Sequence, residues 1–390
     1  MVKNGVFFEN AYNSGAGQGA VCMASRTMLM LGKQLWDAHK YYDDQVRNPA
    51  DFWSTYLKRR GYKTYFTGKW HISNISPKNI YDVTGTIRPG MPNYSDPKLG
   101  GNYRWDQRGA GYFRPSSKND NSWCPSNPIY GGFWEGGIHW SEVIRKEAVD
   151  FIYQAANSKE PFFMAVGYIS THLPFIQPEK YKSLYSDKDL VFSDLRTIPK
   201  NAPSRAVHEW TELRNAYLDI PSKGPVSPKM EEDLIRAYYS TVSYLDTLIG
   251  KLIGTLDDLG MRDNTTIIFW SDHGFFLGEH GFWCKHHTFQ EAIHVPLIIS
   301  SPGKKKNIQS NALVEYVDIY PTLCEVAGIR PPEYIHGKSM VPLLDNPSID
   351  FKSEIYSRYQ FREVVQDHDY SYHEILNYNK FYFDRQGNKK

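Results

Sequence analysis

The sequence predicts an α/β fold in which helices cover both faces of a mostly parallel central sheet, with a small antiparallel subdomain at the C-terminal end. Two observations carry this prediction. Short apolar segments typical of buried strands alternate with longer segments of helical periodicity, which favours a parallel sheet between helices. Beyond about residue 345, short aromatic segments replace this pattern. We therefore expect a large domain over residues 1–345 and a small, truncated subdomain over residues 346–390.

The first expected elements surround a cysteine. Residues 5–13 (GVFFENAYN) read as a short strand and loop, and a glycine-rich segment then approaches Cys22. From Ser25 the pattern is helical, with an apolar face and a stop at Gly32. Cys22 is therefore expected at a helix N-terminus, where exposed N–H groups and the helix dipole favour a bound anion.

The next elements bring basic side chains to the edge of the sheet. Residues 52–60 predict an amphipathic helix, and residues 61–67 predict the strand that follows it. Lys69 and His71 come directly after this strand. Because ligands of open α/β sheets gather at the carboxyl ends of the strands, both side chains are candidates for a site there.

Later strands end in polar residues in the same way. The expected elements are a helix over 141–157, a strand over 161–169, a long helix over 229–259 and strands over 265–270 and 295–300. His172 follows the first of these strands, and Asp272 and His273 follow the second. The sequence therefore predicts that these residues meet at one edge of the sheet.

The remaining segments lack periodicity or are short. Residues 74–137 and 178–226 are rich in loop-forming residues, so we expect long loops there that shape a substrate site. Residues 353–359 and 380–383 read as antiparallel strands of the terminal subdomain.

The composition excludes several classes of protein. With 390 residues, 41% of them apolar, the chain can bury one large core and a smaller one. Its 45 basic and 43 acidic residues are interspersed and leave a net charge of +2, so no footprint for nucleic acid is visible. No apolar run reaches the roughly 18 to 20 residues that span a bilayer, and no signal segment is present. The four cysteines have no metal-ribbon spacing.

Four motifs carry a resemblance to a known family. They are CMASR over residues 22–26, GKWH over 68–71, SDHG over 271–274 and LGEHGFWCKHHTFQEAIHVPLII over 277–299. Together they resemble the sulfatases, formylglycine-dependent enzymes of the alkaline-phosphatase-like superfamily. The match runs in a consistent order over about residues 5–345, with spacing close to the iduronate-sulfatase and arylsulfatase-like branches.

The resemblance implies a modified nucleophile at Cys22. In the family a formylglycine-generating enzyme reads the C-x-P/A-x-R pattern and oxidises the cysteine to an aldehyde, and Ala24 takes the less common option. The hydrate of this aldehyde attacks sulfur, and its second hydroxyl then expels sulfate. A lone cysteine is more often a small buried core residue, so this implication depends on the accompanying motifs.

The resemblance also assigns the other site residues. Arg26, one helical turn beyond Cys22, holds the hydrate or its metal environment. Lys69 and Lys285 grip sulfate oxygens, while His71 assists turnover of the covalent intermediate. His172 contacts sulfate and protonates the leaving oxygen. Taken singly, each of these residue types has at least an even chance of a merely structural role.

A divalent cation, usually calcium, belongs to the family's site. Asp272 and His273, with the formylglycine oxygen at Cys22, are its candidate ligands here. Calcium prefers six to eight oxygen-type ligands, and the family supplies more from an aspartate pair on a first strand. Since only 21 residues precede Cys22, we expect that strand to be missing, with an exposed sheet edge and weaker metal binding. The acidic pair Asp43-Asp44 reads as solvated and not as a replacement.

The expected function is removal of sulfate from a sulfated carbohydrate or another small sulfate ester. One alternative is a phosphonate or phosphate ester hydrolase of the same superfamily, since some members use the same cysteine motif. A third possibility, from a different class, is a catalytically incomplete relative that binds sulfated glycans. The resemblance also implies an extracytoplasmic location, which is periplasmic, secreted or lysosomal. The charge pattern and the apolar runs indicate no nucleic-acid partner and no membrane span.

Overall fold

The structure is a computed structural model. It describes residues 1–16, 21–38, 48–72, 74–88, 132–133, 139–173, 175–198, 200–202, 212–213, 220–221, 224–360, 362–375 and 380–384. The Asp43-Asp44 pair, and most of the loop expected over residues 74–137, lie outside these ranges. No helix in the described ranges has both the length and the apolar character needed to cross a membrane.

The central strands form two sheets. In the first sheet the order is β12 (Ile308–Glu315), β1 (Val6–Tyr12), β11 (Leu297–Ser300) and β8 (Ile267–Trp270). Strand β1 is parallel to β12 and antiparallel to β11, and β11 is antiparallel to β8. In the second sheet the order is β4 (Val83–Arg88), β3 (Lys63–Lys69) and β6 (Phe162–Gly167), and both pairings are parallel.

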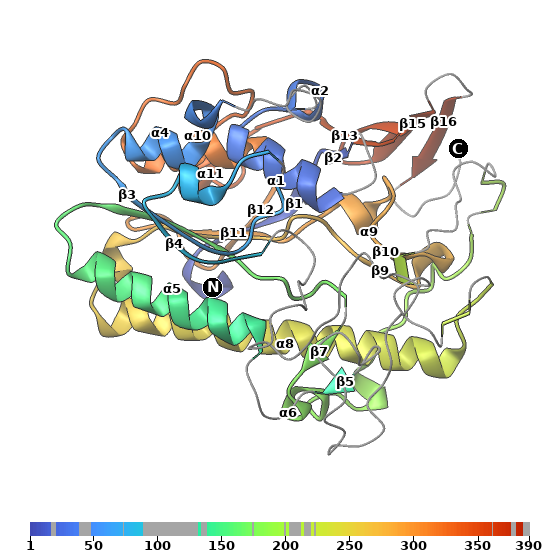
Figure 1. Ribbon diagram of the computed structural model, residues 1–390. Helices are drawn as coiled ribbons and strands as arrows, with labels where there is room; N and C mark the ends of the chain where they lie inside the picture. The colour runs from blue at the N-terminus through green and yellow to red at the C-terminus, as the bar shows by residue number, and fades with distance from the viewer. Residues whose placement is uncertain are drawn as a thin grey trace.

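Helices cover both faces, as predicted (Figure 1). On the lower face α5 (Trp140–Ala156) and α8 (Pro228–Asp258) lie side by side. On the upper face lie α1 (Val21–Leu31), α4 (Trp53–Lys58) and α10 (Ile319–Val326). Helix α8 begins with Ser227 as N-cap and Pro228 at the first helical position, a combination that satisfies a free N–H and fixes the backbone for the first turn.

Short elements connect these layers. They are β2 (Gly15–Ala16), α2 (Leu35–Ala38), β5 (Gly132–Phe133), β7 (Ile176–Gln177), α6 (Glu179–Lys182), β9 (Phe276–Leu277), β10 (Trp283–Cys284), α9 (Gln290–Ile293) and α11 (Val341–Asp345). Strands β9 and β10 form a small antiparallel pair. This pair is separate from both central sheets, and the CKHH segment over residues 284–287 begins in β10.

The C-terminal strands form an antiparallel sheet, as predicted. Its order is β16 (Lys380–Asp384), β15 (Tyr370–Ile375), β14 (Arg362–Gln366), β13 (Ile355–Tyr359) and β2. Strand β2 pairs with β13 in parallel, so a segment close to the N-terminus completes this sheet. A boundary after residue 345 therefore places β2 and β13 in different domains although they are hydrogen-bonded to each other. The two-domain division stays a prediction.

The largest hydrophobic core joins both central sheets to the upper helices. Phe8 of β1, Phe66 of β3, Leu29 of α1 and Tyr320 of α10 are all buried in it. Burying a side chain of this size stabilises the fold by about 1.5–3 kcal/mol. The end of β3 and the start of α1 are thereby fixed relative to each other, which matters because both carry candidate site residues.

Several expected elements differ from the structure. Helix α1 begins at Val21, so Ser25 lies inside the helix and is not its N-cap, and Cys22 lies within the first turn. Gly32 does end it, with φ of +64°. Strand β4 lies inside the segment expected to be a loop. Its pairing with β3 holds it extended, and local periodicity gives no sign of that pairing. Strand β12 was likewise not predicted, and β11 gives the sheet two antiparallel pairings.

A cavity of about 1420 Å³ lies between β6 and β8. Residues 162–171 and 264–275 line it, together with apolar side chains of α8. Each of these strands is the last in its sheet, and on the cavity side neither pairs with another described strand.

Candidate active site

Cys22 lies at the start of α1, against the end of β8. Its Sγ is 3.0 Å from Nε2 of His273. Nδ1 of His273 is 2.7 Å from the carbonyl oxygen of Gly274, which can only accept, so Nδ1 carries a proton and Nε2 is left facing the thiol. Both side chains are nearly enclosed. In a chain with formylglycine, Cys22 Sγ marks the position of the aldehyde oxygen or its hydrate.

Asp272 joins three elements at this point. Its Oδ2 accepts from Arg26 Nε at 2.8 Å and lies 3.4 Å from Lys69 Nζ. Arg26 also donates through Nη1 to the main-chain oxygen of Lys69, at 2.8 Å. Arg26 comes from α1, Lys69 from the end of β3 and Asp272 from the residues after β8. These bonds bring together sequence-predicted site residues separated by more than 200 positions.

The charges of this cluster oppose the effect of burial. Burial and the Asp272 carboxylate raise the pKa of Cys22, but His273, Lys69 and Lys285 outweigh them and hold it well below its usual range. Burial also raises the pKa of Asp272, and Lys69, Arg26 and His273 together bring it well below its usual range. The cluster therefore stabilises negative charge at the position of Cys22, as a nucleophile for an anionic ester requires.

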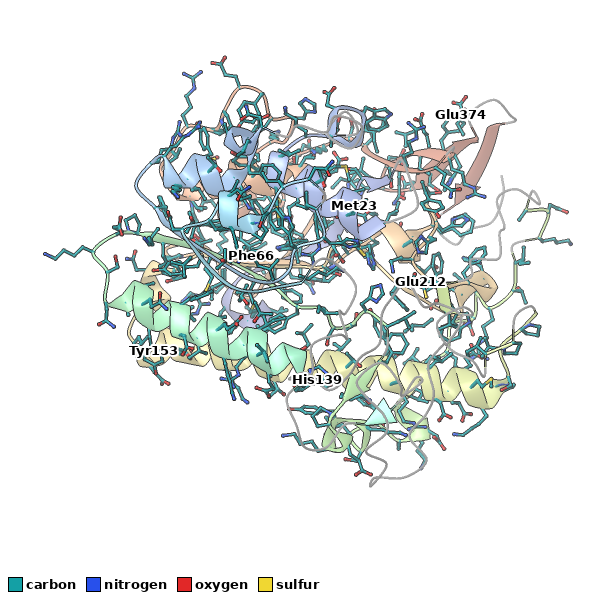
Figure 2. The ribbon with its side chains drawn as sticks, viewed as in Figure 1. Met23, Phe66, His139, Tyr153, Glu212 and Glu374 are labelled. Atoms are coloured by element: carbon teal, nitrogen blue, oxygen red, sulfur yellow. The ribbon has the colours of Figure 1, made fainter. Side chains whose placement is uncertain are left out.

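A second cluster surrounds Lys285, which directly follows β10. Its Nζ lies 3.2 Å from His172 Nε2 and donates to both carboxylate oxygens of Glu212, at 2.6 and 2.9 Å. His286 Nε2 lies 2.9 Å from the second of these oxygens. Figure 2 shows Glu212 beside the short β9–β10 ribbon and over α8. Lys285 lowers the thiol pKa of Cys22, so the two clusters act on one another electrostatically.

His71 is the predicted site residue that the described contacts do not join to either cluster. It follows β3 with φ of +55°, and its Nδ1 is buried without a hydrogen-bond partner among the described atoms. The other predicted residues Cys22, Arg26, Lys69, Asp272 and His273 form the first cluster, while His172 and Lys285 belong to the second.

Two residues of the second cluster were missed by sequence reasoning. Glu212 lies in a segment without periodicity or motif, so no local signal points to it. His286 lies in the motif over residues 277–299 but was assigned no role there, and its ring contacts the Glu212 carboxylate. Only the folding of residues 212–213 against β10 brings this carboxylate to Lys285.

One group of side chains among the described residues could hold a metal ion. It consists of Cys22, Asp272 and His273, whose ligand atoms lie within 4.8 Å of one another. As a calcium site this set does not fit. It offers one carboxylate, one imidazole and one thiol, whereas calcium takes six to eight oxygen ligands. The carboxylate is also already bonded to Arg26 and close to Lys69. A calcium ion here needs oxygen donors beyond the described cluster.

Comparisons with known proteins agree with the motifs. The sulfatase family model matches residues 1–329. The chain belongs to the sulfatase family. A second family model, the C-terminal region of N-sulphoglucosamine sulphohydrolase, matches residues 278–385 and so spans β10 and the strands β13 to β16 of the terminal sheet. Sulfuric ester hydrolase is therefore the enzyme class of this chain.

Curated relatives of this sulfatase cover most of its length. Iduronate 2-sulfatase from Homo sapiens is 28% identical and covers 94% of this chain, which spans 70% of that protein. Against the Mus musculus enzyme, the chain spans 64% of the relative's length at 27% identity. An arylsulfatase from Clostridium perfringens is 26% identical over 100% of this chain and 80% of its own.

Solved structures share the fold of this sulfatase. A protein in complex with its substrate D-glucosamine-2-N,6-O-disulfate aligns with a TM-score of 0.72 and 21% identity, over 100% of this chain and 86% of that one. Phosphonate monoester hydrolase from Silicibacter pomeroyi aligns with a TM-score of 0.76 and 19% identity, over 100% and 84%. At these identities the likeness concerns the fold, which is the alkaline-phosphatase-like fold expected from the sequence.

Proposed function

We propose that this sulfatase hydrolyses sulfate monoesters of a carbohydrate through a formylglycine formed from Cys22. The observation that carries the proposal is the contact of Cys22 with His273, beside an Asp272 carboxylate bonded to Arg26 and close to Lys69. This arrangement supports an anionic nucleophile next to two cations that can hold an anionic ester. A formylglycine-generating enzyme is the partner this proposal requires.

The remaining roles follow from the two clusters. Lys69 and Lys285 are the proposed holders of the sulfate oxygens, and their electrostatic effect on the position of Cys22 supports this. His172, 3.2 Å from Lys285, is the proposed acid for the leaving oxygen. Arg26 keeps Asp272 in place and so orients the nucleophile's surroundings. His71 is retained as a proposed helper in release of the covalent intermediate, on the GKWH motif alone.

Calcium is part of the proposed mechanism only if ligands beyond Cys22, Asp272 and His273 complete its site. Because the described donors are too few, oxygen atoms from beyond this cluster are required to complete such a site. The cavity between β6 and β8 touches Asp272 and His273, so further oxygen ligands can approach the cluster there. Calorimetric titration of the protein with Ca²⁺ tests whether ligands are lacking, and we expect an affinity weaker than that of ordinary calcium sites. Tight binding would mean that the cluster suffices.

The proposed substrate class and location draw on the relatives. Relatives described as iduronate 2-sulfatase, and the solved complex with a disulfated glucosamine, support a sulfated carbohydrate as substrate. Of the two loops expected to select the sugar, the one over residues 74–137 lies mostly outside the described residues. We also propose an extracytoplasmic location, by analogy with the family, which fractionation of producing cells would test.

The first experiment is peptide mass spectrometry across Cys22 after co-expression with a formylglycine-generating enzyme, combined with an aryl sulfate assay of the same sample. We expect conversion of Cys22 and turnover of the ester. Cys22→Ala should retain the fold and lose turnover by at least about 10²-fold, because only the nucleophile is removed. Turnover by Cys22→Ala at the wild-type rate would exclude the formylglycine route.

The same assay separates the alternatives. Sulfate and phosphate esters of one leaving group should be compared with a phosphonate monoester, since the phosphonate hydrolase shares the fold. Faster turnover of phosphorus esters would overturn the sulfatase proposal. Protein that carries formylglycine and bound metal, but turns over no ester while binding sulfated glycans, would be the incomplete, binding-only relative.

A further inference from the structure

Glu212 is the centre of a buried polar network, and it lies outside every motif identified in the sequence. Both of its carboxylate oxygens accept from Lys285 Nζ, at 2.6 and 2.9 Å. The first oxygen also lies 3.2 Å from His172 Nε2, and the second lies 2.9 Å from His286 Nε2. The side chains of Lys285, His172 and His286 are 4–5% exposed, and that of Glu212 is 13% exposed.

The carboxylate's acceptor capacity is used mainly by its own partners. An ionised carboxylate offers about four lone-pair sites, of which the two lysine contacts and the His286 contact use three, and a protonated His172 uses the fourth. Glu212 also supplies the negative charge that the buried Lys285 requires. A role in binding the sugar is therefore disfavoured, and a role in controlling its three partners is favoured.

The geometry at His172 shows what that control is. Nδ1 of His172 is 2.8 Å from the carbonyl oxygen of Leu173, so Nδ1 carries a proton in either charge state. Nε2 then faces two groups at the same distance of 3.2 Å, Lys285 Nζ and a Glu212 oxygen. When Nε2 is unprotonated it accepts from Lys285, and when it is protonated it donates to Glu212.

Both protonation states of Nε2 therefore have a partner in place. A general acid needs this arrangement, because it gives up a proton and must recover one in every turnover. Without Glu212, only the partner of the unprotonated state remains, and the adjacent lysine charge opposes protonation. Burial and Lys285 lower the pKa of His172, Glu212 opposes this shift, and Lys69 adds to it.

We propose that Glu212 is a positioning residue that holds Lys285 and keeps a proton available on His172 Nε2 for transfer to the leaving oxygen. This inference rests on the proposed function, because it assumes the acid role of His172. The proton moves from Nε2 to the ester oxygen as the nucleophile at position 22 bonds to sulfur and the bond between sulfur and the ester oxygen breaks. The neutral imidazole then takes up a proton from solvent.

The test compares two variants of Glu212 with a matched control. Glu212→Gln removes the charge at nearly constant size, and Glu212→Asp keeps the charge on a shorter stem. Glu231→Gln is the control, because the Glu231 side chain is also 13% exposed and pairs with a cation, Arg196, outside both clusters. Each formylglycine-bearing protein is assayed on aryl sulfates whose leaving groups range from activated to poor.

We expect Glu212→Gln to lose about 10- to 100-fold in kcat on poor leaving groups and less than about 3-fold on activated ones, since acid catalysis matters most for a basic leaving oxygen. Glu212→Asp should recover part of the loss, and Glu231→Gln should match wild type on every ester. An equal loss of kcat across the series in Glu212→Gln, or none, would overturn the inference. A loss confined to KM would also overturn it, because that result would make Glu212 a substrate-binding group.

A second readout does not depend on turnover. Nitrogen-15 NMR of labelled histidine side chains follows the charge state of His172, and the imidazolium should persist to higher pH in wild type than in Glu212→Gln. Identical titration of His172 in the two folded proteins would refute the inference even if the enzyme proved inactive on sulfates. Inactivity of wild type with the expected NMR difference would instead reject the proposed function and leave the Glu212–His172 coupling standing.

Discussion

Replacement of Glu291 by glutamine should change how the stability of this sulfatase depends on pH. Glu291 lies in α9, whose Ala292 carbonyl accepts from the N–H of Gly274 next to the nucleophile cluster. Its side chain is 20% exposed, Oε1 is 3.7 Å from His280 Nε2, and Oε2 is buried without a hydrogen-bond partner among the described atoms. Burial also lowers the pKa of His280, so that ring does not supply a compensating charge at neutral pH.

The size and sign of the effect follow from linkage. Burial raises the pKa of Glu291 from 4.5 to about 7. Between these values the folded chain keeps a proton that the unfolded chain has lost, so stability falls as the pH rises through this window. The contribution is fully present below pH 4.5 and lost above pH 7. A difference of about 2.5 pH units corresponds to about 3 kcal/mol.

The assay is urea unfolding of wild type and Glu291→Gln at several pH values. Glutamine does not titrate, so the stability of the variant relative to wild type should rise by about 3 kcal/mol between pH 4.5 and pH 8. Glu333→Gln is the control, since that side chain is 87% exposed, and its difference from wild type should stay flat. A difference for Glu291→Gln that does not change with pH would refute the argument from burial.

Two further substitutions test the geometry of the nucleophile cluster. Gly68→Ala places a Cβ 2.0 Å from the Gly167 carbonyl oxygen at φ of +98°, so it should displace the end of β3 and lower turnover at least about 10-fold. Its control Gly61→Ala, at φ of +86° with open space around it, should cost only about 1–2 kcal/mol of stability and leave turnover near wild type. Equal effects of the two variants in urea unfolding and ester assays would contradict this. Asp272→Asn should destabilise the fold by about 3–5 kcal/mol, because the buried cations of Arg26 and Lys69 lose their anion. Adding Arg26→Met should restore part of this loss. Unfolding midpoints that stay unchanged would show that solvent already compensates these charges.

Local patterns were sufficient for the elements with strong periodicity. The helices α5 and α8 and the strands β1, β3, β6 and β8 were all predicted within a few residues, because each carries its own apolar pattern. Strands β4 and β12 were not predicted, since their pairing partners, and not their own sequences, hold them extended. The start of α1 was placed four residues too late, because Val21 and Cys22 give no capping signal.

The motifs were sufficient to identify the family and the nucleophile candidate, since Cys22, Lys69, Asp272 and Lys285 lie in stretches whose residues adjoin along the chain. How these groups act on one another depends on the fold. Only in the fold does Asp272 lie against Arg26 and Lys69, and only there does Glu212 reach Lys285 and His172. The physical reason is that charge interactions depend on distance and burial in three dimensions, which no local pattern along the chain records.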